Sequence, residues 1–352
     1  MKRKFFASIV VLSVFLSSCV PTDTQSAWYD VSEVQIGVDS ISGDEIADLI
    51  EYLASSALEG RRSGTPGGLM AAEYIRDNLK DSSFLPAVPD YFQEFSFYDL
   101  KDHRSEQLIE FLKNSGYNVE FSGRNVAGII EGAEKPDEYI VLVAHYDHIG
   151  LQKDGMHLGA DDNASGTAAV LEIAEALGIL SQNGIYPSRS IIVLFADAEE
   201  WGLWGSKYFA ANSPVPVEDI VAVVNLDMVG RNDVGEVWVI GSPRIDDFSD
   251  RNPQLARATD AAAKITGIKL VYPVETGREE QIFYRSDQAS FYFVRANPIP
   301  VVFYTAGLHP DYHTPADTAD KVNNEKVRDI ARFALFVIWG ISEFSTVPVY
   351  NE

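Results

Sequence analysis

The chain has 352 residues, a formal net charge of -24 and an isoelectric point near 4.5. A surface this acidic repels phosphate backbones, so we expect no nucleic-acid partner. The length suits one large core, and we expect a single α/β domain over residues 40–352.

Residues 1–18 predict a secretory signal peptide. A basic start, Lys2 to Lys4, precedes an apolar stretch from Phe5 to Leu16. The following Ser17-Ser18-Cys19 completes a resemblance to the bacterial lipobox, whose cysteine receives a diacylglycerol anchor. We therefore expect an exported bacterial lipoprotein, anchored to a membrane through Cys19 and facing the periplasm or the cell surface. An ordinary signal peptide that happens to contain a thiol is the alternative.

Cys19 is the only cysteine of the chain. The rest of the sequence therefore offers no internal disulfide, thiolate metal site or cysteine nucleophile. Removal of residues 1–18 takes away three cations and no acids, which changes the formal charge from -24 to -27. The polar, weakly periodic residues 19–39 predict a lipid-anchored tether.

Two helices are predicted to open the domain, at about Gly43 to Ala57 and Pro66 to Leu79, the second with proline at its first position. The glycine-rich stretch between them, Gly60 to Gly68, lacks the Gly-Lys-Ser/Thr ending of a phosphate-binding loop, and we interpret it as a turn. Residues 81–122 are aromatic, with one helical patch at Glu106 to Ser115. We expect these residues to form either a flap over the site or an excursion, that is, a loop that leaves the core and returns to it.

From Asn125 onward, short apolar runs alternate with amphipathic stretches. Apolar residues recur at helical spacing in Ala164 to Leu180, which predicts a helix with Glu172 and Glu175 turned outward. Continuous apolar runs suit strands that are covered on both faces. The predicted strands are Val126 to Ile130, Tyr139 to Ala144, Ile191 to Ala196, Ile220 to Leu226 and Ile299 to Tyr304.

Alternating strands and helices predict a three-layer α/β/α sandwich with a mixed, mainly parallel sheet. A last helix is expected from about Asn324 to Phe344, packed on the core. Its apolar part, Ile330 to Ile341, is interrupted by Arg332 and is shorter than the roughly 20 residues that a membrane span needs.

Acidic and histidine residues recur where the predicted strands end, and in an open α/β sheet functional groups gather at that edge. Imidazoles and carboxylates together suit zinc or a similar divalent ion. Two ions about 3.5–4 Å apart need a bridging carboxylate, for which we choose Asp161, just before a helix start. Of the adjacent Glu199 and Glu200, one can bind metal while the other carries protons. The candidate ligands are His145, Asp161, Glu200, Asp227 and His313.

Each of these residues also has an ordinary structural interpretation. Asp161 and Asp162 could cap the following helix, and Glu199-Glu200 could be a solvated loop. Asp227 after an apolar strand, however, would be costly to bury without a cation. His148 lies beside the candidate ligands and stays outside the ligand set. Surface or satisfied core positions are expected for His103, His157 and His309.

Taken together, five motifs in this order resemble peptidase family M28, the zinc aminopeptidases and their relatives. They are His145-Tyr146-Asp147, Gly159 to Gly166, Glu199-Glu200, Asn225 to Met228 and His313-Thr314. The resemblance implies a fold of the zinc-exopeptidase (phosphorylase/hydrolase-like) type and two co-catalytic Zn²⁺ ions. One ion would take His145, Asp161 and Asp227, and the other Asp161, Glu200 and His313.

The same resemblance implies that Glu199 is the general base and that Asp147 orients His145, with a cis peptide between Asp161 and Asp162. The expected reaction is removal of N-terminal residues from peptides with a free N-terminus, through a metal-bridging hydroxide. Tyr284 and Tyr312 are candidates for contacting the substrate oxyanion, and packed aromatic positions are the alternative for both.

Two other functions stay open at this point. A glutaminyl cyclase, which uses a single zinc, is a relative with the same fold, but retention of all five ligand positions favours hydrolysis. A non-catalytic binding member of the superfamily would be expected to lack ligands. Residues 81–122 are too few for the protease-associated insert of longer relatives, so we predict that this insert is absent.

Overall fold

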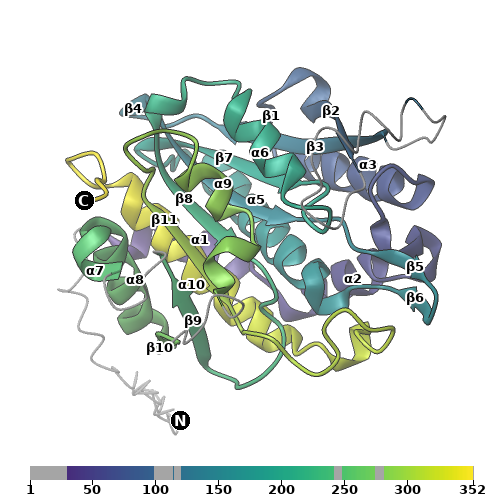
Figure 1. Cartoon of the computed structure of the whole chain (residues 1–352). Coiled ribbons are helices and arrows are strands. Elements are labelled where there is room, and N and C mark those ends of the chain that lie inside the picture. Colours follow the sequence, from purple (N-terminus) through teal and green to yellow (C-terminus); the bar gives the residue numbers. More distant parts are fainter. Residues whose placement is uncertain (1–29, 99–113, 115–119, 242–247, 274–280, 352) are drawn as a thin grey trace, which may run out of the picture.

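The computed structural model describes residues 30–98, 114, 120–241, 248–273 and 281–351 (Figure 1). The signal sequence, Cys19, and the helical patch expected at 106–115, apart from residue 114, lie outside the described residues. Within them, a nine-stranded mixed sheet runs through the molecule with helices on both faces. This arrangement confirms the predicted three-layer α/β/α sandwich.

Four parallel strands form the centre of the sheet, in the order β7 (Arg189–Ala196), β4 (Lys135–His145), β8 (Ile220–Leu226) and β11 (Val301–Thr305). Antiparallel partners flank this centre, because β3 pairs with β7 and β9 pairs with β11. The outer strands are β1 (Leu85–Pro86), β2 (Phe92–Tyr98), β3 (Glu120–Ile130), β9 (Glu236–Ile240) and β10 (Lys269–Val271).

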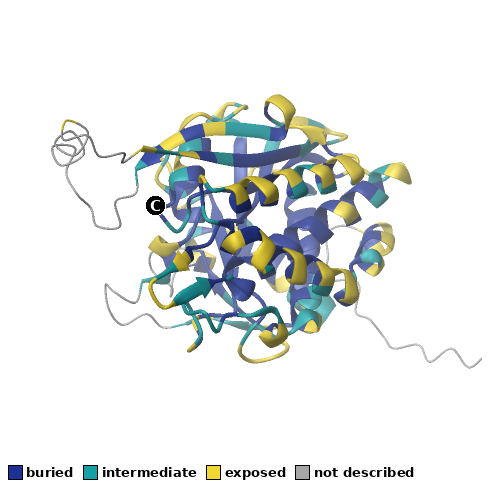
Figure 2. Ribbon diagram, turned by 90° about the vertical axis from the view of Figure 1, so that its right-hand side faces the viewer, coloured by how far each residue is buried: buried dark blue, intermediate teal, exposed yellow. Residues whose placement is uncertain are grey.

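Alternate side chains of the central strands enter two separate hydrophobic cores. Ile140 and Leu142 of β4 face one core, whereas Val141 and Val143 face the other. Figure 2 shows the strands buried and the helices exposed mainly on their outer sides. The first core is covered by α1 (Val31–Ser40), α2 (Gly43–Leu53), α3 (Pro66–Asp81), α5 (Gly166–Gln182), α7 (Phe248–Arg251), α8 (Pro253–Thr266) and α10 (Asn324–Ser342), and the second by α6 (Trp204–Ala211) and α9 (Gln288–Tyr292).

Most of the strands expected from continuous apolar runs are present, and β8 has the predicted bounds. The sequence analysis did not predict strands β9 and β10 or helices α6, α8 and α9. Large apolar residues are few or interrupted in each of them. The segment Ala160–Gln182 is long and apolar enough to cross a membrane by composition, but 83 % of its most apolar window is buried. It is therefore a core helix with its preceding turn.

Helix α1 occupies the end of the segment that was predicted to be a tether. Asp30 caps it by accepting a hydrogen bond from the Ser32 backbone N–H at 2.9 Å. Val34 and Val38, one turn apart, are buried, and Gly37 lies directly against Leu180 of α5. The tether prediction is therefore wrong for residues 31–39, because two well-spaced valines are enough to dock this short helix.

Part of the segment proposed as a flap belongs to the sheet instead. Strand β2 pairs antiparallel with β3 over its whole length, from Phe92 to Tyr98. Phe95 and Phe97 are buried in a small cluster with Trp201, so this strand is anchored at the sheet edge. Residues 99–113 and 115–119 lie outside the described residues.

Glu172 on α5 is buried, with 3 % of its surface exposed, and not turned outward as the sequence suggested, because α1 and α2 cover that side of α5. Its Oε2 atom accepts a hydrogen bond from the Ser42 backbone N–H at 2.8 Å. Burial, with repulsion from Glu45 and Glu175, raises the pKa of Glu172 from 4.5 to about 7. The folded protein therefore holds this proton more tightly than the unfolded chain.

Glu172→Gln is expected to remove a pH dependence of stability. Between pH 4.5 and 7 the wild type loses stability as the pH rises, because the folded state must give up its proton while the unfolded chain has already done so. Glutamine keeps an acceptor for Ser42 and carries no charge. In urea unfolding, the wild type and the variant should have equal free energies of unfolding below pH 4.5. At pH 8 the free energy of unfolding of the variant should be higher by up to about 3 kcal/mol.

Glu51→Gln, at an exposed position on α2, is the control and should differ little from the wild type at any pH. A constant difference between Glu172→Gln and the wild type across the pH range would contradict the buried-carboxyl account.

Candidate metal centre

The candidate site lies where the parallel strands end. His145 is the last residue of β4, Asp227 follows β8 directly, and Glu199 and Glu200 come three and four residues after the end of β7. Because these strands are parallel and adjacent, their carboxyl ends meet at one edge of the sheet. His313 arrives from the loop after β11. These side chains therefore converge at the edge where the sequence analysis expected them.

The side chains form two groups that share one carboxylate. In the first group, His145 Nε2 lies 3.4 Å from Asp162 Oδ1 and 3.4 Å from Asp227 Oδ1. In the second, His313 Nε2 lies 3.0 Å from Asp162 Oδ2 and 3.0 Å from Glu200 Oε2. Asp162 therefore presents one oxygen to each group, which is the arrangement of a carboxylate that bridges two ions.

The donor atoms of the two groups are spaced as ligands of a divalent metal ion, and they do not form hydrogen bonds with one another. His145 Nε2, His313 Nε2, Asp162 Oδ2 and Asp227 Oδ1 are buried, and none has a hydrogen-bond partner among the described residues. Buried polar atoms are normally paired, so orphaned ones call for an explanation. Ligands at about 2.0–2.2 Å from a tetrahedral zinc ion lie roughly 3.3 Å apart, close to the spacings found here. The donor set of imidazoles and carboxylates also suits zinc.

Asp161, chosen from the sequence as the bridge, belongs to neither group. Its Oδ1 accepts a hydrogen bond from the Gly230 backbone N–H at 2.7 Å, and its Oδ2 lies 3.2 Å from His309 Nε2. The two adjacent carboxylates point in different directions in this turn, so Asp162 occupies the place expected for Asp161. The cis peptide likewise joins Asp162 to Asn163, one residue later than expected.

The turn Ala160–Ser165 that carries Asp162 is held from several sides. The Asp317 carboxylate accepts hydrogen bonds from the backbone N–H groups of Asp161 and Asp162, each at 3.1 Å. Asn163 Oδ1 accepts from the Met228 backbone N–H at 3.1 Å, which ties the turn to the residue after Asp227. The sequence analysis did not identify Asp317, since a lone aspartate in a loop carries no motif.

Arg61 is a second element that holds the site in place. It is fully buried, and its guanidinium donates to the carbonyl oxygens of Tyr146, Leu158 and Gly159 at 2.7 Å each. Burial lowers its pKa to about 10, so it remains a cation at neutral pH beside Asp147 and Asp162. The Gly60-Arg61 turn is thus a positioning device and not a phosphate loop.

Asp147 acts on its neighbours through two different groups. Its backbone carbonyl lies 3.1 Å from His145 Nδ1, whereas its carboxylate oxygen Oδ1 is 3.6 Å from that nitrogen. The carboxylate accepts hydrogen bonds from the backbone N–H groups of Glu199 at 3.0 Å and Glu200 at 3.3 Å. Asp147 is therefore arranged to orient His145 through its carbonyl, and its carboxylate fixes the turn that carries both glutamates.

Glu199 lines a pocket next to both groups. The pocket is formed by polar residues of the site together with apolar side chains: Asp162, Glu199, Asp227, Met228, Ile282, Arg285, Phe303, Thr305, Gly307, Leu308 and Tyr312. Burial raises the pKa of Glu199 well above its usual range, and the carboxylates of Glu200, Asp287 and Asp227 add to this effect. A carboxyl group with a raised pKa is suited to accept and return a proton.

The two candidate tyrosines differ in position. The Tyr312 ring stacks on His313, with ring centroids 3.9 Å apart, and its hydroxyl accepts a hydrogen bond from Arg285 at 3.2 Å. Tyr284 is 42 % exposed and stacks on Phe293 in a separate groove between α6 and α9. Of the two, Tyr312 borders the site.

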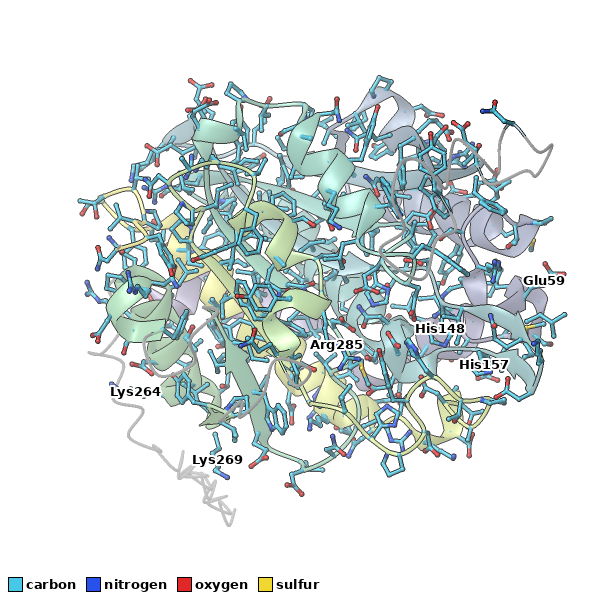
Figure 3. The ribbon with its side chains drawn as sticks, viewed as in Figure 1. Glu59, His148, His157, Lys264, Lys269 and Arg285 are labelled. Carbon is cyan, nitrogen blue, oxygen red and sulfur yellow. The ribbon has the colours of Figure 1, made fainter. Side chains whose placement is uncertain are left out.

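Four other histidines were set aside in the sequence analysis, and one of them, His103, lies outside the described residues. His157 is buried, and its Nε2 lies 2.9 Å from Asp154 Oδ1. His309 is buried and faces Asp161 Oδ2. His148, labelled in Figure 3, lies within the second group beside Asp162, Glu200 and His313. Its position three residues after His145 was the one available signal.

Known proteins resemble this chain in sequence and in fold. Residues 125–338 match the model of peptidase family M28. The probable glutamate carboxypeptidase VP8 of Zea mays is 33 % identical over 231 residues, which cover 62 % of this chain and 30 % of that protein. Aminopeptidase NAALADL1 of Rattus norvegicus is 28 % identical over 253 residues, covering 64 % of this chain and 32 % of that protein. The chain thus spans about a third of the length of these curated relatives.

Solved structures show the same fold. An aminopeptidase from Aneurinibacillus sp. strain AM-1 has a TM-score of 0.66 at 18 % identity, over 91 % of this chain and 97 % of that one. The Porphyromonas gingivalis glutaminyl cyclase has a TM-score of 0.62 at 17 % identity, over 84 % of this chain and 97 % of that one. At these identities the likeness supports the fold alone.

Asp162→Asn and Asp161→Asn should differ in their effects on metal content. An amide in place of the Asp162 carboxylate would have one carbonyl oxygen and no negative charge to share between two groups, so we expect bound zinc to fall from about two ions per chain to one or none. An amide in place of the Asp161 carboxylate keeps an oxygen for the Gly230 N–H, and zinc should stay near the wild-type level. Elemental analysis after gel filtration gives the count, and circular dichroism checks folding. Full retention of zinc by Asp162→Asn, with loss in Asp161→Asn, would restore Asp161 as the bridge.

Proposed function

Because the chain belongs to peptidase family M28, we propose that this zinc-dependent metallopeptidase uses two zinc ions to remove N-terminal residues from peptides. The observation that carries the two-ion proposal is Asp162, whose two oxygens face two different ligand groups. His145 and Asp227 complete one group, and Glu200 and His313 complete the other.

The bound ions would polarise the scissile carbonyl and acidify a water molecule. Glu199 would accept the proton of that water and pass it to the departing amine, as its position in the pocket beside both groups supports. The apolar side chains of Met228, Ile282 and Phe303 would receive the side chain of the residue that is released. Acidic groups around the ions would attract the free α-amine of the peptide.

Glu199→Gln is expected to lose about 10²–10⁴-fold in kcat while zinc content stays near that of the wild type, because the proton acceptor is removed and no ligand is changed. Hydrolysis of aminoacyl amides, measured on zinc-loaded protein, checks the rate. Near-normal turnover would show that another group accepts the proton. Equal loss of zinc and activity would make Glu199 a ligand.

A second candidate activity is favoured by Arg285. This exposed guanidinium lines the pocket and donates to the Tyr312 hydroxyl, and no carboxylate pairs with it among the described residues. An arginine at a pocket rim, with no carboxylate against it among the described residues, is suited to bind the carboxylate of a substrate. Some curated relatives are named probable glutamate carboxypeptidases, so cleavage next to a free substrate carboxylate is the alternative to aminopeptidase action.

Arg285→Gln distinguishes the two activities. If Arg285 binds a substrate carboxylate, kcat/KM for dipeptides with a free C-terminus should fall about 10–100-fold, since a charge-assisted hydrogen bond contributes about 1.5–3 kcal/mol. Aminoacyl amides lack a free carboxylate, so kcat/KM for these substrates should change less than about threefold. Lys264→Gln removes an exposed charge on α8, well away from Arg285 in Figure 3, and is the control. Equal changes for both substrates would exclude carboxylate recognition by Arg285.

Glutaminyl cyclase activity remains a rival with a single-zinc requirement. The first group, His145 with Asp162 and Asp227, supports hydrolysis because it provides for a second ion. We further propose that one peptidase domain begins with α1, whose Val34 and Val38 belong to the core, and continues to residue 352 without a protease-associated insert. A screen of aminoacyl amides, dipeptides, N-blocked peptides and N-terminal glutaminyl peptides, with and without chelator, separates these activities.

Anchoring through Cys19 is also part of the proposal, and it is supported by the sequence of residues 1–19. When the full-length protein is expressed in bacteria with radioactive fatty acid, the protein should become labelled. The labelled protein should cofractionate with membranes. Cys19→Ser should abolish the label and release the protein from membranes. An unlabelled wild type would remove the lipoprotein assignment and leave an ordinary signal peptide.

A further inference from the structure

His148 has an unusual environment for a histidine outside the expected ligand set. Its side chain is fully buried, and its Nδ1 lies 2.7 Å from Glu200 Oε1 and 3.7 Å from Asp162 Oδ2. Both oxygens belong to residues of the second metal group. Its ring also meets that of His313 edge to face, with centroids 5.6 Å apart.

The close approach to Glu200 is not a well-formed hydrogen bond. Neither ring nitrogen of His148 has a hydrogen-bond partner among the described residues, although a carboxylate oxygen lies only 2.7 Å from Nδ1. The N–H direction therefore does not point at that oxygen. His145 and His313 share this combination of a nearby carboxylate and an unpaired nitrogen, and so does His309 beside Asp161. What distinguishes His148 from His309 is its place among the donor atoms of the second metal group. An imidazole in this state is poised to share a cation with its neighbours.

The backbone fixes the His148 ring in this position. A Cβ atom on Gly159 would lie 2.4 Å from His148 Cγ, so glycine is needed for the ring to fit, and its φ of +60° also favours glycine. The Gly159 carbonyl in turn accepts a hydrogen bond from buried Arg61 at 2.7 Å. The ring is thus packed against a rigid segment that leads directly into the Asp162 turn.

We propose, on the basis of the two-zinc function above, that His148 Nδ1 is a fourth protein ligand of the second site. That site would have two imidazoles and two carboxylates, from His148, Asp162, Glu200 and His313, whereas the first site has three donors, from His145, Asp162 and Asp227. Four protein ligands are typical of closed zinc sites, and three leave a position open for water or substrate.

The two sites therefore differ in role. The second site fills first and retains its ion, while the first site exchanges its ion more readily and offers the open position. Activity should accordingly fall when a weak chelator removes one ion, at a point where the other ion is still bound.

The test counts imidazoles on the first ion to bind. Metal-free full-length protein is loaded with one equivalent of zinc, and zinc-edge X-ray absorption reports the number of imidazole ligands. The wild type should give two imidazoles, and His148→Ala and His148→Asn should give one. The dissociation constant for the first equivalent should rise by more than the roughly 10–100-fold that loss of an outer hydrogen-bonding partner costs. Asparagine fills part of the same space, which guards against a variant that fails to fold.

His157→Ala is the matched control, because His157 lies beside His148, with ring centroids 6.5 Å apart, and pairs with Asp154 instead. It should keep two imidazoles and the wild-type affinity. One imidazole in the wild type, or an unchanged count in the His148 variants, would overturn the ligand assignment and leave His148 as a positioning residue. A wild type that binds no zinc would instead refute the metal centre itself, so the two failures are distinguishable.

Discussion

The structure depends on holding several carboxylates together in a buried place. Asp162, Glu200 and Asp227 meet at one sheet edge, and Glu199 lines the same pocket. Burial and repulsion from other carboxylates raise the pKa of Glu199 and Asp227, whereas nearby histidines outweigh burial and lower the pKa of Asp162 and Glu200. Ionised carboxylates are costly to bury without a compensating cation. The proposed pair of divalent ions would remove this cost, and the orphaned donor atoms are placed to receive them.

The fold supplies this geometry by a division of tasks. Parallel strands bring His145, Glu200 and Asp227 to one edge of the sheet. The strands alone do not fix the orientation of these side chains. The orientation is fixed by side chains that form hydrogen bonds with the backbone. Arg61 donates to the segment before Asp162, and Asp317 accepts from the Asp162 turn. The Asp147 carboxylate accepts from the backbone of the two glutamates. Ser286 further steadies Asp227 by donating to its second oxygen at 2.7 Å. Rigid supports of this kind keep a metal site in order.

The sequence predicted the elements with strong periodicity and left out those with weak signals. Strand β8 was found with its bounds, because seven consecutive buried residues leave little ambiguity. Helix α1 was missed, because only three of its residues are buried, Val34, Gly37 and Val38, which is a weak periodic signal. Neighbouring carboxylates caused the main error, since the sequence cannot tell which of Asp161 and Asp162 faces the site. Asp317 was missed, and His148 was left outside the ligand set, for a related reason, as each owes its place to contacts from distant segments.

The most direct test of the two-ion account is a crystal structure with zinc, read from anomalous differences at the zinc absorption edge. The account predicts two peaks about 3.5–4 Å apart, with one oxygen of Asp162 directed at each. A single peak, or two peaks joined by any residue other than Asp162, would contradict it.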